Sequence, residues 1–297
     1  MVLTRWADTS EHNDGHIDRR YKRPWYAFRA NDGTYIDNQV DANLSFAEHY
    51  KRLIGFIVYM VWPRSQGWSS WQETFETLKS LLGNKHRPRL VLMNDVETWS
   101  RTDLYDDFSG SLEELRRAQV AWLHSLRPRW QRIAPFKFVT LRRDNRRVIG
   151  YGNRSDLEKM AGDSKSVKWR WIVLADYTPG LPIPKSFNGW RVVGVQHTNG
   201  VIGDTPHGTA PFGNCDMNVS NFAPHVMARK LGLGPVRKPK PTPPPHPNTK
   251  RTFYIVKSGD SLSSIAASHH TTWRKLQRLN HLHNPNRIYV GQKLRIR

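Results

Sequence analysis

Short apolar runs alternate with segments of helical periodicity through most of the chain. The runs, each of a length typical of a strand, are residues 25–30, 53–60, 90–93, 136–139, 148–151, 169–174 and 192–196. Several are apolar throughout, as strands buried on both faces of a sheet are. Between them, residues 40–52, 68–82 and 111–127 carry helical spacing, and Ser111 with Glu114 forms a capping-box pattern. This alternation predicts an α/β fold, a parallel barrel of the irregular TIM-like (β/α) kind.

The composition changes sharply after the last of these runs. Residues 235–251 are rich in proline and basic side chains, and proline favours an extended polyproline spacer because it lacks a backbone donor. We therefore predict a large domain over residues 1–234, a linker over 235–252 and a small domain over 253–297. A ligand for a proline-recognising domain is the alternative, and it requires a eukaryotic-style partner.

The last segment has its own compact pattern of strand, helix, helix and strand, predicted at residues 253–256, 262–268, 272–280 and 293–296. Gly259 and Asp260 fit a tight turn, and Ser261 fits a helix cap. Six apolar residues are spaced to meet in one small core: Leu262, Ile265, Leu276, Leu279, Ile288 and Leu294. The pattern predicts a small βααβ module.

This module resembles a LysM domain over its whole length, through Tyr254-Ile-Val-Lys-Ser-Gly-Asp-Ser-Leu262 and the continuation to Ile296. In that family, glycans containing N-acetylglucosamine lie in a shallow groove between two loops. The resemblance assigns the groove to the positions that match those loops: Gly259, Asp260, Ser261, Leu262, Asn284, Pro285, Asn286 and Ile288. The alternative is that Asp260 and Asn284 only fold their own turns.

The net charge of +21 favours association with polyanions such as nucleic acid, acidic membranes or acidic wall polymers. The Lys and Arg residues are spread along the whole chain, without metal-binding Cys/His spacing or an RNA-recognition motif. We therefore expect no specific nucleic-acid partner. The basic residues of the small module predict a salt-sensitive attraction to an acidic wall.

The sequence lacks the usual signals of several classes of protein. The single cysteine, Cys215, excludes an internal disulfide and a zinc-type Cys pair. We find no phosphate loop or His-Glu-x-x-His motif, so we expect no cofactor and no metal. The first residues lack an export signal, and no stretch approaches the ~18 apolar residues of a membrane span. We expect no membrane insertion and no export by the chain alone.

Asp95 and Glu97 are the first candidates for catalysis, because they follow the apolar run 90–93. Residues two apart on a strand project to the same side, about 6.6 Å apart along the chain. Two neighbouring carboxyl groups do not both ionise easily, so one has a raised pKa and can act as a general acid. By itself so short a motif also fits a solvated loop.

The order of further motifs resembles the glycoside hydrolase family 25 lysozymes over roughly residues 5 to 222. The matching segments are Trp6-Ala-Asp-Thr-Ser10, residues 28–37, Leu92-Met-Asn-Asp-Val-Glu97, Tyr151, residues 171–177, Val195-Gln-His-Thr198 and Cys215-Asp-Met-Asn218. The resemblance implies an acidic cluster of Asp8, Asp95, Glu97 and Asp216. It implies that Glu97 is the general acid, that Asp95 holds its geometry, and that Asp8 and Asp216 shape the electrostatics.

The same resemblance suggests contacts with sugar rings. Tyr59, Tyr151 and Trp171 are candidates for stacking, with Gln196 as a polar contact, although aromatic residues on apolar strands also serve as core. The family usually shows Gln-Tyr-Thr where this chain has Gln196-His-Thr198. We expect His197 to be structural or to lie at the rim.

Together the two resemblances predict a peptidoglycan hydrolase, a lysozyme that cleaves the β-1,4 bond between N-acetylmuramic acid and N-acetylglucosamine. The architecture resembles phage endolysins. We therefore expect the protein to wait in the host cytoplasm until a holin-type pore releases it to the bacterial cell wall. A non-catalytic wall-binding protein with a degenerate barrel and a bacterial autolysin are the alternatives.

Overall fold

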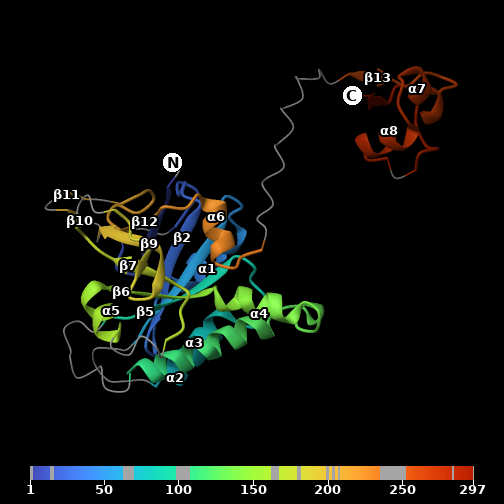
Figure 1. Ribbon diagram of the computed structural model, residues 1–297. Coiled ribbons are helices and arrows are strands. Elements are labelled where there is room, and N and C mark those ends of the chain that lie inside the picture. Colours follow the sequence, from blue (N-terminus) through green and yellow to red (C-terminus); the bar gives the residue numbers. More distant parts are fainter. Residues whose placement is uncertain are drawn as a thin grey trace. The chain divides into compact units, whose positions relative to one another are not determined.

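The computed structural model describes residues 3–13, 17–62, 70–97, 108–161, 167–178, 182–198, 201–202, 205–206, 208–234, 252–282 and 284–296. The chain divides into two compact units, Met1–Val236 and Arg237–Arg297 (Figure 1). The division falls inside the predicted linker, of which residues 235–251 lie outside the described ranges.

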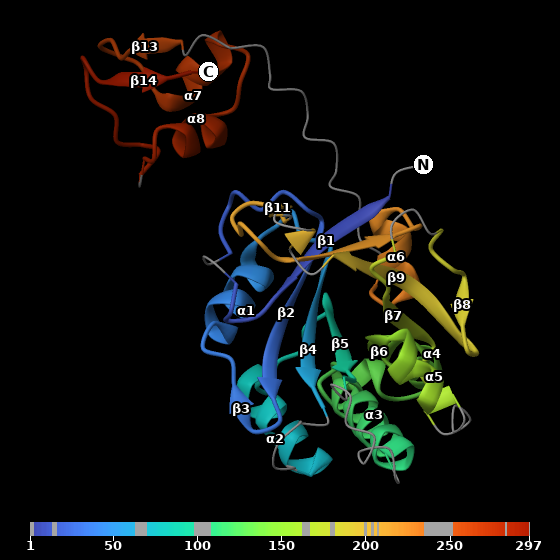
Figure 2. The same ribbon diagram turned by 90° about the vertical axis from the view of Figure 1, so that its left-hand side faces the viewer.

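Eight described strands of the first unit close into a barrel (Figures 1 and 2). In chain order they are β1 (Thr4–Thr9), β2 (Trp25–Asp32), β4 (Gly55–Val61), β5 (Leu90–Asp95), β6 (Val148–Asn153), β7 (Trp171–Ala175), β9 (Trp190–Thr198) and β12 (Asp216–Ser220). Neighbours from β1 through β9 pair in parallel, whereas β12 is antiparallel to both β9 and β1. The predicted irregular (β/α) barrel is confirmed, but its sheet is not parallel throughout as predicted, because the last strand, β12, is reversed.

Helices and short strands surround the barrel. The helices are α1 (Val40–His49), α2 (Trp71–Leu82), α3 (Phe108–Ser125), α4 (Lys137–Asn145), α5 (Arg154–Ala161), α6 (Pro224–Lys230) and the 3-10 turn η2 (Arg129–Gln131). The short strands are β3 (Tyr35–Ile36), β8 (Ser186–Phe187), β10 (Val201–Ile202) and β11 (Thr205–Pro206). Within the described ranges, no helix is long and apolar enough to cross a membrane.

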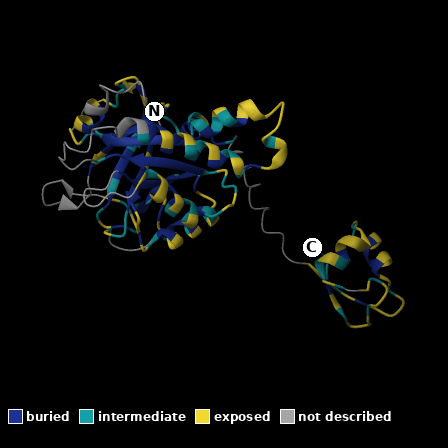
Figure 3. Ribbon diagram, turned by 90° about the horizontal axis from the view of Figure 1, so that it is seen from below, coloured by how far each residue is buried: buried dark blue, intermediate teal, exposed yellow. Residues whose placement is uncertain are grey.

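The barrel strands are buried on both faces, which explains their apolar character (Figure 3). Successive residues of a strand point to opposite faces. On β4, Ile57 and Tyr59 therefore point into the barrel, while Phe56 and Val58 pack under the outer helices. Met227 of α6 packs with the inward side chains.

Most predicted elements are present with ends shifted by a few residues, but two predictions are wrong. Residues 136–139 do not form the expected strand; instead α4 begins at Lys137, and Phe138 is 73% exposed. Ser111 does not cap a helix, because α3 already begins at Phe108. A capping box does exist at the start of α2, where the Ser70 hydroxyl accepts from the Glu73 N–H and the Glu73 carboxylate accepts from the Ser70 N–H.

The second unit has the predicted order of elements. Its elements are β13 (Phe253–Ile255), α7 (Leu262–Ser268), α8 (Trp273–Leu279) and β14 (Lys293–Arg295), with β13 and β14 antiparallel. Gly259 takes a left-handed backbone, φ +87°, and Ser261 caps α7. The core contains the buried side chains of Val256, Leu262, Ile265, Ala266, Leu276, Leu294 and Ile296. The predicted core member Leu279 does not belong to this cluster.

Candidate active site

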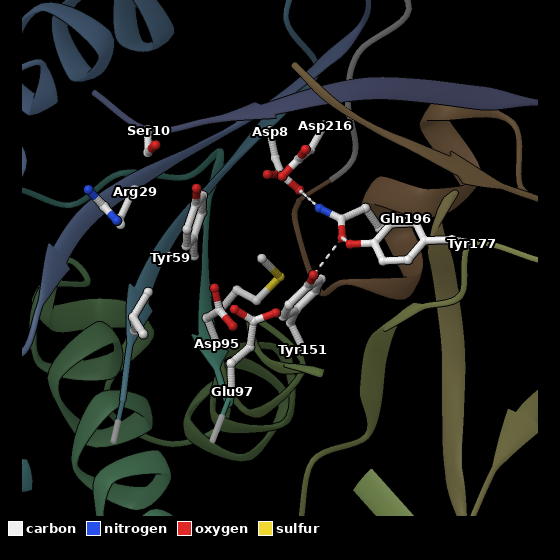
Figure 4. Close-up of a pocket in the computed structure, with 12 residues that line it drawn as sticks. Asp8, Ser10, Arg29, Tyr59, Asp95, Glu97, Tyr151, Tyr177, Gln196 and Asp216 are labelled. Carbon is white, nitrogen blue, oxygen red and sulfur yellow. Dashed lines mark hydrogen bonds between the residues drawn. The ribbon is translucent and has the colours of Figure 1, made fainter. Parts of the chain in front are cut away.

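A polar pocket of about 260 Å³ is hollowed into the barrel (Figure 4). It is lined by Asp8, Ser10, Arg29, Tyr59, Val61, Met93, Asp95, Glu97, Tyr151, Tyr177, Gln196 and Asp216. Most of these residues stand at or just after the carboxyl ends of parallel strands, the end of the barrel where loops and strand ends can present side chains to a ligand.

The strand topology brings the carboxylates together from distant parts of the sequence. Asp95 is the last residue of β5, and Glu97 follows two positions later. Asp8 lies near the end of β1, and Asp216 is the first residue of β12. Because β12 is antiparallel to β1, its first residue reaches the same rim, where Asp216 is the register partner of Asp8.

Asp95 and Glu97 form the first acidic pair, with their carboxyl groups next to each other in Figure 4. Asp95 is only 7% exposed, and its Oδ1 has no hydrogen-bond partner among the residues that the structure describes. Burial raises the pKa of Asp95 well above its usual value, and the negative charges of Glu97 and Asp8 raise it further. The pair therefore holds a proton where an exposed carboxylate would have lost it.

Asp8 and Asp216 form the second pair. Burial raises the pKa of Asp8 to about 6, against the opposing effect of hydrogen bonds from the side chains of Asn218 and Gln196. Burial raises the pKa of Asp216 to about 8, with further contributions from the charges of Asp8 and Glu97. Asp8 keeps the lower pKa because the Asn218 amide donates to its Oδ2 at 2.9 Å.

Gln196 connects this second pair to the aromatic wall of the pocket. Its Nε2 donates to Asp8 Oδ2 at 3.3 Å. Its Oε1 accepts from the hydroxyl groups of Tyr151, at 2.5 Å, and Tyr177, at 2.7 Å. Because two hydroxyl groups donate to the carbonyl oxygen, the amide group is oriented with its N–H groups toward the acids.

Arg29 is the one cationic side chain among the residues that line the pocket. Its Nε donates to Asp37 Oδ2 at 3.3 Å, and its guanidinium lies 3.8 Å from Glu11 Oε1. Since these two acids compete for its charge, Arg29 does not neutralise the four carboxyl groups. The pocket therefore favours a ligand that develops positive charge.

The structure brings most of the predicted site residues to this pocket. Those that line it are Asp8, Asp95, Glu97, Asp216, Tyr59, Tyr151 and Gln196. Tyr59 is held by a hydrogen bond from its hydroxyl to the Thr9 carbonyl at 3.0 Å. His197, the next residue after Gln196, is exposed and does not line the pocket, because adjacent strand residues face opposite ways.

Trp171 requires a correction, because it is not part of the pocket lining. It is the first residue of β7, at the opposite end of that strand from the pocket, and is 4% exposed. Its ring meets Phe222 edge-on at 6.0 Å between centroids, with Lys230 Nζ 5.4 Å from the ring centre. Trp171 therefore belongs to the core at the amino end of the barrel.

Five further residues line the pocket that were not predicted as site residues: Ser10, Arg29, Val61, Met93 and Tyr177. Tyr177 carried a usable signal. It stands two residues after the end of β7, as Glu97 stands two residues after the end of β5. The rule that barrel sites gather at carboxyl ends of strands would have selected it.

The second unit has a groove of about 450 Å³. It is lined by Asp260, Ser261, Leu262, Ser263, Trp273, Pro285, Asn286 and Ile288. Gly259 and Asn284, both predicted for the groove, do not line it. Asn284 instead supports its own turn, since its Oδ1 accepts from the Asn286 N–H at 2.9 Å.

Asp260 fits both predicted readings, as a groove residue and as a turn residue, and Trp273 is a groove residue that was not predicted. Asp260 lines the groove and also folds its own turn, accepting from the Lys257 N–H at 2.7 Å and the Tyr254 hydroxyl at 2.9 Å. Trp273, which the prediction omitted, is 37% exposed at the start of α8. The Arg274 guanidinium lies 4.8 Å from its ring centre.

No cluster of His, Cys, Asp or Glu suited to a metal ion occurs within the described ranges. The acids of the pocket are arranged for proton donation by a buried carboxyl group and for stabilisation of positive charge by its neighbours.

Thus the chain joins an acidic-pocket α/β barrel to a small βααβ domain. Residues 254–297 match the family model of the LysM domain, so this part of the chain is a LysM domain. The N-acetylmuramoyl-L-alanine amidase sle1 of Staphylococcus saprophyticus is 60% identical over 45 residues, which are 15% of this chain and 14% of the relative. The amidase XlyB of Bacillus subtilis is 49% identical over 43 residues, 14% of each chain.

Other similarities extend over more of the chain. An uncharacterized protein of Mycobacterium tuberculosis is 27% identical over 253 residues, covering 78% of this chain and 75% of the relative. A lysozyme from Streptomyces coelicolor matches with 19% identity and a TM-score of 0.47, covering 77% of this chain and 96% of the other. A family 25 glycosyl hydrolase from Bacillus anthracis matches with 14% identity and a TM-score of 0.48, covering 74% and 89%.

Proposed function

We propose that the first unit is a glycoside hydrolase of the family 25 lysozyme type. Its substrate would be peptidoglycan, cut at the β-1,4 bond between N-acetylmuramic acid and N-acetylglucosamine. The observation that supports this proposal most is the convergence of Asp8, Asp95, Glu97 and Asp216 in one barrel pocket. Glycosidases act through acid pairs of this kind, in which one carboxyl group retains its proton.

Glu97 is the proposed general acid, which protonates the leaving glycosidic oxygen and later takes a proton from water. Asp95, held in the buried pair, keeps that proton available and stabilises positive charge on the sugar ring. Asp8, with a pKa of about 6, is mostly ionised at neutral pH and adds negative potential around the oxocarbenium-like centre, whereas Asp216, with a pKa of about 8, keeps its proton there and shapes the electrostatics as a neutral acid. Among the residues that line the pocket, Arg29 is the one cation, and Asp37 and Glu11 compete for its charge.

The tyrosines of the pocket are the proposed contacts for the sugar rings. Tyr59, Tyr151 and Tyr177 combine an aromatic face with a hydroxyl group at the pocket wall. In the second unit, the groove with Trp273 is the proposed glycan site. Tethering the barrel to the wall would raise its local concentration at an insoluble substrate.

The experiment is to measure loss of turbidity and release of reducing sugar from purified peptidoglycan. We expect activity in the wild type, loss of it in Glu97→Gln, and retention in the matched control Glu76→Gln, whose side chain is 67% exposed on α2. Release of free amino groups without reducing sugar would indicate an amidase. Equal, negligible activity in all three proteins would favour a non-catalytic wall-binding protein.

We further propose that the protein acts as a phage endolysin, held in the host cytoplasm until a holin-type pore gives it access to the cell wall. The pairing of a catalytic-type barrel with a LysM domain supports a lytic role at the wall. Expression in bacteria with and without a pore-forming protein tests it. Lysis that depends on the pore supports the endolysin, and lysis without it indicates an autolysin.

A further inference from the structure

The segment between α3 and α4 exposes large apolar side chains. We call residues 128–143 the basic apolar protrusion, which contains η2 and the first turns of α4. Five of its apolar side chains are about half exposed or more: Trp130 57%, Ile133 54%, Phe136 49%, Phe138 73% and Val139 55%. Figure 1 shows α4 at the periphery of the barrel unit.

The base of the protrusion is fixed, so these side chains are held outside. The Arg127 guanidinium donates to both oxygens of Asp144, at 2.7 and 2.8 Å, and Arg147 donates to the same carboxylate at 3.2 Å. The Thr140 hydroxyl donates to the Gln131 carbonyl at 2.7 Å, joining η2 to α4. Above this base, Trp130 and Phe136 pack only edge-on against each other, at 5.6 Å.

Positive charge accompanies the apolar surface. Arg129, Arg132, Lys137 and Arg142 are exposed, and none of them forms an ion pair within the part of the chain that the structure describes. The only acid of the protrusion and its base is Asp144, which is buried and already paired. The surface thus offers aromatic and aliphatic groups beside uncompensated cations.

We propose that the basic apolar protrusion is a docking site for the surface of an anionic phospholipid bilayer. Aromatic and aliphatic side chains enter the boundary between headgroups and acyl chains, and Lys and Arg contact the phosphates. This interaction is separate from hydrolysis in the barrel pocket, and it does not depend on the function proposed above.

Charge complementarity favours this occupant over the others. A second copy of the chain carries the same net charge of +21, so two protrusions repel each other. Residues 253–297 carry eight Lys or Arg residues and only Asp260 as an acid, so this segment is repelled as well. Nucleic acid satisfies the cations but offers no apolar phase for Ile133 and Val139.

The experiment is sedimentation of the full chain with vesicles of phosphatidylcholine mixed with phosphatidylglycerol, and with vesicles of phosphatidylcholine alone. We expect binding to the mixed vesicles that weakens as salt rises. Replacing Trp130→Ser together with Phe138→Ser lowers the partition coefficient by about tenfold or more, because each buried large apolar side chain contributes on that scale. Replacing Arg129→Ser together with Arg132→Ser lowers it by roughly tenfold as well.

The matched control is Tyr289→Ser together with Val290→Ser, which removes two side chains of 60% and 70% exposure from the LysM unit. Binding by the control equals that of the wild type. Equal binding by wild type and the Trp130/Phe138 variant, with unchanged circular dichroism, overturns the proposal. Two other results also overturn the proposal. One is self-association of the wild type that the Trp130/Phe138 variant loses, which assigns the surface to a second copy of the chain. The other is a loss of affinity for duplex DNA equal to the loss for vesicles, which assigns the surface to nucleic acid.

Discussion

The barrel pocket and the LysM groove both contain an aspartate, and the two environments change its acidity in opposite directions. Burial and neighbouring negative charges raise the pKa of Asp95. Hydrogen bonds from the Lys257 N–H and the Tyr254 hydroxyl lower the pKa of Asp260 in its open turn. The first carboxyl group retains a proton, whereas the second is a fixed hydrogen-bond acceptor.

The two sites also differ in how the chain builds them. The pocket assembles Asp8, Asp95 and Asp216 from three strands far apart in the sequence. The groove takes all its residues from 260–288, within one small domain. Catalysis needs the enclosure that only long-range packing provides, while binding needs only a stable local surface.

The largest expected effect separates the two sites by function. Glu97→Gln lowers reducing-sugar release by about 100- to 10,000-fold, the contribution typical of a positioned general acid. Sedimentation with insoluble peptidoglycan stays as in the wild type, because the groove is untouched. A variant that loses wall binding in parallel with activity would contradict the division of labour between the units.

Removing residues 253–297 tests the same division of roles between the two units, this time by taking away the LysM unit. Wall lysis falls by roughly 10- to 100-fold through the lost tether, while hydrolysis of soluble glycan fragments stays within about twofold. Turbidity assays and soluble-fragment assays on the same preparation provide the comparison. Full wall binding by the truncated protein would assign anchoring to the basic barrel instead.

The Asp216→Asn substitution measures how much the burial of an ionisable acid in the pocket lowers the free energy of unfolding. The folded pKa of Asp216 is about 8, against 3.8 for the free group, so ionisation favours the unfolded chain as pH rises from about 4 to about 8. Asparagine does not ionise, so the Asn variant does not lose stability in this way as pH rises. At pH 9 its free energy of unfolding is about 1–3 kcal/mol higher than that of the wild type, and the difference vanishes below pH 4.

Denaturant unfolding across this pH range measures the effect. A matched substitution, Asp260→Asn, gives no stabilisation at pH 9, since the pKa of Asp260 is lowered rather than raised. Stabilisation of both variants would show that the gain does not come from the burial of Asp216, because the net charge of +21 becomes more positive in each of them.

The smallest expected effect concerns the groove. Trp273→Ala weakens binding of chitooligosaccharides by about tenfold, because an exposed aromatic face is lost from the groove wall. Calorimetric titration with the purified oligosaccharide measures it, and hydrolysis of soluble peptidoglycan fragments stays unchanged. Replacing Tyr289→Ala, which does not line the groove, is the control.

The sequence predicted those features that local pattern determines. Several strands of the barrel, such as β4 and β7, are apolar on both faces, and the LysM unit has turn, cap and core positions in close succession. Residues 136–139 were misread because an apolar run shows hydrophobicity but not whether other elements cover it. Trp171 was misplaced because alternation shows which residues face the barrel interior, and not which end of the barrel they occupy.

The pairing of Asp8 with Asp216 could not be derived from periodicity. It depends on β12 entering the barrel antiparallel, and no local pattern encodes the direction of a neighbouring strand. Trp273 was missed for a similar reason, because its place in the groove depends on how α8 packs beside the two loops.

Closure of the barrel by its first and last strands has a consequence during synthesis. A nascent chain that ends before β12 lacks Asp216 and leaves Asp8 without its register partner, so the pocket does not yet exist. The pocket is completed only when residues up to Ser220 have left the ribosome, while the LysM segment is still being made. Chains terminated before β12 therefore lack the complete pocket, and only molecules whose translation has passed the end of the barrel contain all four of its acids.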